Sequence, residues 1–319
     1  MVGNPLYDTQ YFVAYAVGEN EMHKRRTDLA LEQHELSCAR SAADTVDGVS
    51  LRRRRSGGYV VTEVRVRTKE GARAIERPVG NYITMDISSY WRREDGYFPR
   101  AVQALSKELR ALLPAQCGAA LVVGLGNDAV TPDALGPQTV SHIFVTRHLV
   151  GSMPREFGNL CSVSAVAAGV LGTTGVEAAE LTDSLVRRTK PQAVIAVDAL
   201  ASRRMERLCA TVQLSDSGIS PGSGVGNHRF TLSRETLGVP VISVGVPTVV
   251  EAATLAADIL EDAGAQVPEQ LGQGRERTLF VTPRDIDEQV RELSRVIGYA
   301  IDLALQPKLS FDDIPSYLS

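Results

Sequence analysis

The pattern of apolar and polar positions divides the chain at about residue 119. Residues 1–40 are polar and mixed in charge, and they contain no long periodic segment that could form a core. Tyr59–Thr68 alternates between apolar and polar positions, which predicts a half-buried strand, and 81–87 predicts a second strand. Pro99 opens a predicted helix whose apolar residues share one face, namely Val102, Leu105, Leu109 and Leu112.

Beyond this point, short apolar runs alternate with segments of helical periodicity. A last helix is expected with Thr282 as its cap and Pro283 in its first position. Near-continuous apolar strands that alternate with helices predict an α/β fold. We expect a three-layer α/β/α arrangement with a mostly parallel central sheet, extended by the N-terminal strands. The predicted strands are 119–123, 162–167, 193–197, 209–214, 240–246 and 278–282, and the predicted helices between them are 137–150, 176–188 and 251–262.

Composition and charge narrow the class of protein. With 319 residues and 44% hydrophobic content, the chain can bury a sizeable core. The net charge of −4 gives no basic excess, so direct nucleic-acid binding is not expected, and the run Arg52–Arg55 is interpreted as a solvated loop. No signal core begins the chain and no apolar run reaches membrane-spanning length, so we expect a cytoplasmic protein without membrane contact.

Cysteines and histidines give no metal motif. The four cysteines include no CxxC pair and are expected to be reduced thiols. None of the five histidines forms HxxxH or HExxH. We therefore expect neither a metal site nor a cofactor.

Two aspartates follow predicted strands and are each followed by Ala-Leu. Asp133 lies in Thr-Pro-Asp-Ala-Leu after 119–123, and Asp198 directly ends 193–197. The carboxyl ends of parallel strands meet at one sheet edge, so the two side chains could lie together and share a proton. One could then accept a proton from water while the other donates to a leaving amide. On pattern alone, Asp198 is more simply explained as the cap of a helix over Ala199–Arg207.

Other motifs favour structural explanations. Gly124-Leu125-Gly126 lacks a third glycine and a phosphate-loop lysine, so it is interpreted as a tight turn rather than a nucleotide site. Asp216-Ser217-Gly218 is one copy of the triplet of aspartic proteases, but in an α/β chain it indicates a turn. The glycine-rich stretch 218–226 that follows could shape a substrate cleft or serve as a crossover.

Several long blocks resemble the spore germination protease family, among them VVGLGNDAVTPDALGP, KPQAVIAVDALASRR and SDSGISPGSGVGNHR. The resemblance runs from about residue 27 to the C-terminus. It implies an atypical aspartic endopeptidase, related in fold to the hydrogenase maturation endopeptidases, that degrades small acid-soluble proteins coating DNA in spores. It also implies a homotetramer in the spore core, without a required metal. The essential aspartates of the family correspond to Asp133 and Asp198.

The resemblance further implies a zymogen that removes its own N-terminal segment. Arg26–Glu32 resembles both the processing site and the substrate consensus, which places the cut between Asp28 and Leu29. The expected division is a propeptide, 1–28, and a peptidase domain, 29–319, made of N-terminal strands and a helix (29–115) and an α/β core (116–319). Substrates of the family carry Glu before the cut, so Asp28 is one methylene shorter. The same residues could also begin a short amphipathic helix capped by Thr27.

Acidic residues on both sides of the cut need cationic partners. The candidates are Arg203, Arg204, Arg207, His228 and Arg229, although the first three could simply form a solvated helix face. Two other classes of protein remain open. One is a metal-dependent maturation peptidase that uses the same aspartates as ligands, and the other is a nucleotide-binding module without catalysis.

Overall fold

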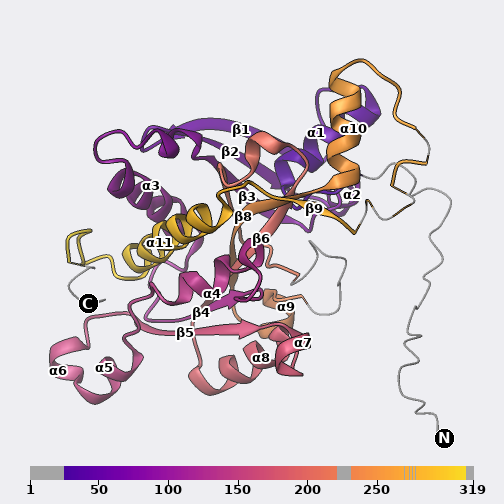
Figure 1. The fold of residues 1–319 in the computed structure, drawn as a ribbon. Helices are drawn as coiled ribbons and strands as arrows, with labels where there is room; N and C mark the ends of the chain where they lie inside the picture. Colours follow the sequence, from indigo (N-terminus) through magenta and orange to yellow (C-terminus); the bar gives the residue numbers. More distant parts are fainter. Residues whose placement is uncertain are drawn as a thin grey trace, which may run out of the picture.

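One nine-stranded sheet organises the computed structural model of the chain, which describes residues 25–220, 231–268, 270–272, 274, 276 and 278–313 (Figure 1). The strand order is β1-β2-β3-β7-β8-β6-β4-β5, and β9 pairs with β8. The strands are β1 (Val49–Ser56), β2 (Tyr59–Val66), β3 (Gly80–Asp86), β4 (Ala119–Leu125), β5 (Ser162–Gly169), β6 (Ala193–Ser202), β7 (Thr211–Ser215), β8 (Val241–Glu251) and β9 (Phe280–Val281).

The sheet combines a parallel half and an antiparallel half. Strands β5, β4, β6 and β8 are parallel, whereas β7, β3, β2 and β1 extend the sheet through antiparallel pairs. The predicted α/β class and the N-terminal strands are therefore confirmed, and parallel pairing is confined to one half. The prediction of a solvated loop for Arg52–Arg55 is wrong, because these residues belong to the edge strand β1. Exposed arginines are compatible with such an edge because they oppose strand-to-strand aggregation.

The helices vary widely in length. The longer ones are α1 (Ala30–Ser41), α3 (Tyr97–Leu112), α8 (Ala178–Thr189), α10 (Ala252–Asp262) and α11 (Ile286–Leu305). The short α-helices are α2 (Lys69–Ala74), α4 (Leu135–Val140), α5 (Arg147–Ser152), α6 (Pro154–Phe157), α7 (Leu171–Thr174) and α9 (Arg234–Leu237). Three 3₁₀ turns are η1 (Ser88–Arg92), η2 (Thr131–Asp133) and η3 (Met205–Arg207). No helix among these residues is long and apolar enough to cross a membrane.

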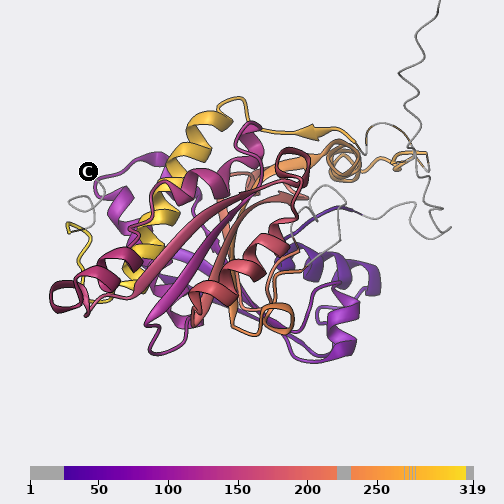
Figure 2. The same cartoon turned by 90° about the horizontal axis from the view of Figure 1, so that it is seen from below.

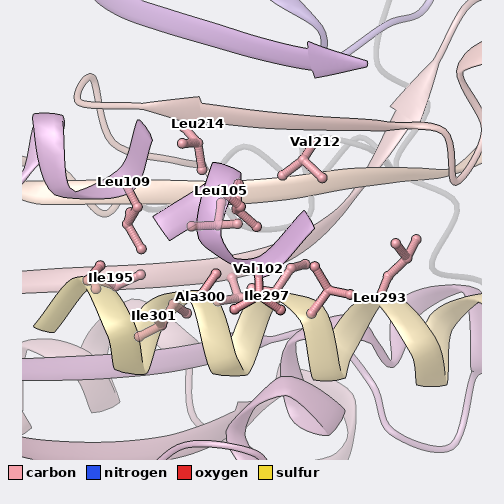
Figure 3. Close-up of a cluster of buried hydrophobic side chains, with 14 of the residues drawn as sticks. Val102, Leu105, Leu109, Ile195, Val212, Leu214, Leu293, Ile297, Ala300 and Ile301 are labelled. Atoms are coloured by element: carbon pink, nitrogen blue, oxygen red, sulfur yellow. The ribbon is translucent and has the colours of Figure 1, made fainter. Parts of the chain in front are cut away.

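One face of the sheet is covered by α3, α4 and α11. Leu105 of α3 and Ile297 of α11 pack against Ile195 and Leu214 of the strands (Figure 3). Each such side chain is fully or almost fully buried, which contributes roughly 1.5–3 kcal/mol per residue. This layer makes the sheet a rigid base for groups on its other face.

Two of the longer helices, α8 and α1, pack on the opposite face, one toward each end of the sheet. Val186 of α8 packs with Leu121 and Val194, over the β5 end of the sheet. Leu31 of α1 packs with Val64 at the other end (Figures 1 and 2). Between these helices, Leu29 and Leu237 of α9 pack in the same cluster as Val241 of β8. Side chains of β6, β8 and β7 that point to this face therefore lie on the side of the sheet that carries α1 and α8.

Some predicted helix boundaries are wrong for identifiable reasons. Residues 137–150 form two helices, α4 and α5, because the N–H of Phe144 between them donates to the Asp302 carboxylate at 3.0 Å. The last helix starts at Ile286, since the Thr282 hydroxyl donates to the Thr248 carbonyl at 2.8 Å instead of capping. The predicted helices 176–188 and 251–262 are confirmed as α8 and α10.

Candidate active site

Asp133 is held at the end of β4 by a loop that only glycine permits. Gly126 has φ +106°, and a Cβ there would lie 2.0 Å from the Asp133 carbonyl oxygen. The carboxylate of Asp133 accepts the N–H of Asn127 at 2.7 Å. Thr248 of β8 donates its hydroxyl to the Pro132 carbonyl at 2.7 Å, which fixes the turn. The Gly-Leu-Gly motif therefore positions a carboxylate through a tight turn, as its turn interpretation predicts.

Asp198 does not cap a helix. Strand β6 continues through it to Ser202, and Asp198 pairs in register with Gly245 of β8. Ala196 and Val194, two and four positions earlier, point to the face on which α8 packs, so Asp198 points there as well. The side chain is 7% exposed, and its Oδ1 accepts the N–H of Ala199 at 2.9 Å.

Both carboxyl groups have raised pKa values. Burial raises the pKa of Asp133, and the Asn127 N–H partly offsets it. Burial raises the pKa of Asp198 much further, and the nearby carboxylates of Asp133 and Asp28 add to this shift. Both shifts favour the protonated form of the pair, and burial favours it more strongly at Asp198.

Two adjoining cavities border the pair. One of about 230 Å³ contains both Asp133 and Asp198 in its wall, together with Thr248 and Phe280. The other, of about 260 Å³, is lined by Asp28, Gln213 and residues of β3 and β8. Leu200 lines both cavities and lies between them. The two adjoining cavities, which share Leu200 as a wall, are together called the cleft below.

A segment of the chain itself, Thr27–Ala30, lies in this cleft. The N–H of Asp28 donates to the Ala201 carbonyl at 2.8 Å, and the Asp28 carboxylate accepts the Ala201 N–H at 2.8 Å. Arg77 donates to the Thr27 carbonyl at 2.5 Å and lies 3.8 Å from the Asp28 carboxylate. Leu29 is fully buried among apolar side chains of the α8 layer. The predicted cut site and Asp198 are therefore close neighbours.

The candidate arginines bind acids of the chain itself rather than open solvent. The Arg203 guanidinium donates to Asp258 at 2.8 Å, and Arg204 donates to Asp262 at 2.6 Å. Their backbone N–H groups donate to the buried carboxylate of Glu32, at 2.6 and 3.1 Å. The interpretation of a solvated helix face is therefore wrong, because β6 and its following turn direct these groups inward.

Glu32 is the centre of a second cluster at the end of this segment. Its side chain is fully buried, and it accepts the Thr27 hydroxyl besides the two backbone N–H groups. The guanidinium of Arg207 lies 3.5 Å from the same carboxylate and also pairs with Glu35 at 2.7 Å. Burial raises the pKa of Glu32, although each of these hydrogen-bond and charge partners lowers it. His228 and Arg229 lie outside the described residues.

The remaining motifs have structural roles. Asp216 accepts the backbone and side-chain N–H groups of Asn81 at 2.7 and 2.6 Å, so Asp-Ser-Gly forms a turn. Among the described residues, no three His, Cys, Asp or Glu side chains are grouped to hold a metal ion. All four cysteines are free thiols in the structure.

Sequence reasoning missed Gln213 and Arg77, which contact the segment in the cleft. Gln213 alternates with apolar residues inside β7, and Arg77 follows the short helix α2. Neither carries a motif. Only the sheet order, which places β7 beside β8 and β3, brings them to the cut site.

Comparison with known proteins defines the class and then the family. Residues 25–270 match the peptidase family A25, described as germination protease. The germination protease of Clostridium perfringens (strain SM101 / Type A) is 40% identical, over 93% of this chain and 100% of the relative. That of Caldanaerobacter subterraneus subsp. tengcongensis is 43% identical, over 89% and 95% of the two chains. The protein is thus a peptidase, and it belongs to the germination protease family.

A solved structure is also similar to part of the chain. It is the NiFe hydrogenase maturation protease HycI from Thermococcus kodakarensis KOD1, with 16% identity and a TM-score of 0.34. The match covers 61% of this chain and 98% of HycI.

Proposed function

We propose that this protein is an endopeptidase that first cuts its own chain between Asp28 and Leu29. The observation that carries the proposal is the position of Asp28, which lines a cavity next to the one that Asp133 and Asp198 line and is hydrogen-bonded to Ala201, three residues after Asp198. Membership of the germination protease family supports a role in spore germination. Its substrates would then be small acid-soluble spore proteins, and its place of action the spore core.

The two aspartates divide the proton transfers in this proposal. Asp133, whose pKa is less raised, is ionised and takes a proton from water as the water oxygen attacks the Asp28 carbonyl carbon. Asp198, whose pKa is raised further, supplies its proton to the departing Leu29 nitrogen. The peptide bond breaks, leaving the Asp28 carboxyl group and a new amine at Leu29. Transfer of the proton from Asp133 to Asp198 then restores the starting state of both aspartates.

Intact mass of the full chain over time tests this function. At mildly acidic pH, where Asp198 holds its proton, we expect loss of residues 1–28 and a new N-terminus at Leu29. The same rate is expected in a chelator such as EDTA. Loss of processing in EDTA, with recovery on adding nickel or zinc, would favour the metal-dependent alternative. A chain that stays intact while nucleotides raise its melting temperature would favour a binding module.

Asp28→Glu is expected to speed self-processing severalfold. The Asp28 carboxylate lies 3.8 Å from the Arg77 guanidinium, which is long for a salt bridge, and one more methylene lets the carboxylate reach it. The rate is measured by intact mass beside the wild type, with Asp28→Asn as the control that removes the charge and keeps the length. An unchanged rate in Asp28→Glu would show that this side-chain contact does not limit cleavage.

A further inference from the structure

Gln213 touches the backbone on both sides of the Asp28–Leu29 bond. Its Nε2 donates to the Asp28 carbonyl oxygen at 3.1 Å, and its Oε1 accepts the Ala30 N–H at 2.7 Å. A carbonyl can only accept and an N–H can only donate, so the orientation of this amide follows from its partners. The side chain is buried, which excludes water from both bonds and strengthens them.

The sheet register places Gln213 in the same row as Asp198. Gly245 of β8 pairs with Asp198 on one side and with Gln213 on the other. Residues paired across neighbouring strands point to the same face, so both side chains extend into the cleft. A Cβ on Gly245 would lie 2.5 Å from the Leu200 side chain, so glycine leaves room for Leu200 between the two. The carboxyl group of Asp198 and the amide of Gln213 therefore lie on the same face of the sheet, with the Leu200 side chain between them.

We propose that Gln213 is the residue that aligns and polarises the peptide bond to be cut, by binding its carbonyl and the N–H of the second residue after it. This inference rests on the proposed function. The contact is to backbone atoms alone, so Gln213 would hold any substrate in the same register, whatever its side chains. As water attacks, negative charge develops on the carbonyl oxygen, and the Nε2–H bond strengthens. Gln213 thus lowers the barrier as well as fixing the position.

Self-processing of the full chain gives the first test. Gln213→Met keeps the size of the side chain and loses both hydrogen bonds, and we expect processing to slow by about 10²-fold or more, as for loss of one donor to a developing oxyanion. Gln103→Met is the matched control, because it makes the same exchange at an exposed position of α3 outside the cleft, and it should process at the wild-type rate. Gln213→Met processing as fast as the wild type would overturn the proposal.

A second test leaves the protein unchanged, so folding of the variant does not matter. Processed wild-type enzyme is given a synthetic peptide of residues 25–34, carrying an N-methyl group at Ala30 or, as a control, at Leu31. Methylation at Ala30 removes the N–H that Gln213 accepts and should lower kcat/KM at least tenfold more than methylation at Leu31. Equal losses of kcat/KM on methylation at Ala30 and at Leu31 would also overturn the proposed role of Gln213.

The two tests separate this inference from the proposed function. If the wild type neither processes itself nor cuts the unmodified peptide, the peptidase function toward this segment fails. If the wild type does both and the Gln213 and N-methyl changes have no effect, only the role of Gln213 fails.

Discussion

Replacing Asp198 by asparagine is expected to slow cleavage of the Asp28–Leu29 bond by about 10³-fold or more. Asparagine keeps the size of the side chain and can still accept the Ala199 N–H, but it has no acidic proton to donate. The rate is measured by intact mass of the full chain. The control is Asp183→Asn, since Asp183 lies on α8 and pairs with the exposed Arg187. If Asp198→Asn loses residues 1–28 as fast as the wild type, another group performs the chemistry.

The same substitution is expected to stabilise the fold at pH 7. The folded pKa of Asp198 lies well above its ordinary value of 3.8, so the folded state binds more protons than the unfolded state between those two values. Stability of the wild type therefore falls as pH rises through this range, and the asparagine variant escapes that loss. Denaturant unfolding should show a variant that is more stable at pH 7, with an advantage that shrinks as pH falls from the raised pKa of Asp198 toward about pH 4 and is absent below it. A variant that is inactive and less stable would instead indicate a structural role.

The aspartate pair could be predicted from the sequence because each carboxylate follows a continuous apolar run. Such runs identify parallel strands, and parallel strands end at a common edge. The alternative interpretation of Asp198 as a helix cap is wrong, because β6 continues to Ser202, past a register shift at Leu200/Ala201. Its raised pKa depends on burial and on Asp133 and Asp28, which only the tertiary structure brings near.

Contacts to the cut site could not be predicted, because they depend on the order of strands. Gln213 occupies a polar position in an otherwise apolar strand, and periodicity shows which face it points to but not what lies there. Likewise, the arginines after Asp198 have guanidinium groups directed at α10 and at Glu35, while two of their backbone N–H groups bind Glu32. In the structure, Glu32 is contacted by the guanidinium of Arg207 and by the backbone N–H groups of Arg203 and Arg204, a division that the residue types alone do not indicate.

Truncating Glu32, which follows the segment in the first turn of α1, is expected to destabilise the fold strongly. Glu32→Ala removes a fully buried carboxylate and leaves the N–H groups of Arg203 and Arg204 without their acceptor, while Arg207 keeps its pair with Glu35. Breaking a buried ion pair from one side typically costs about 3–5 kcal/mol. Denaturant unfolding of the Asp198→Asn chain, which retains residues 1–28, measures the loss without processing.

Glu35→Ala is the matched control for this change. Glu35 lies on the same helix and pairs with the same Arg207 at 2.7 Å, but its side chain is 38% exposed. A partly exposed pair of this kind contributes at most about 1 kcal/mol. The difference between the two variants therefore measures what burial adds at Glu32, because both lose a contact to one arginine. If the two variants lose equal stability, the Glu32 cluster does not hold the segment in the cleft, and the backbone contacts of Asp28 and Ala30 must hold it instead.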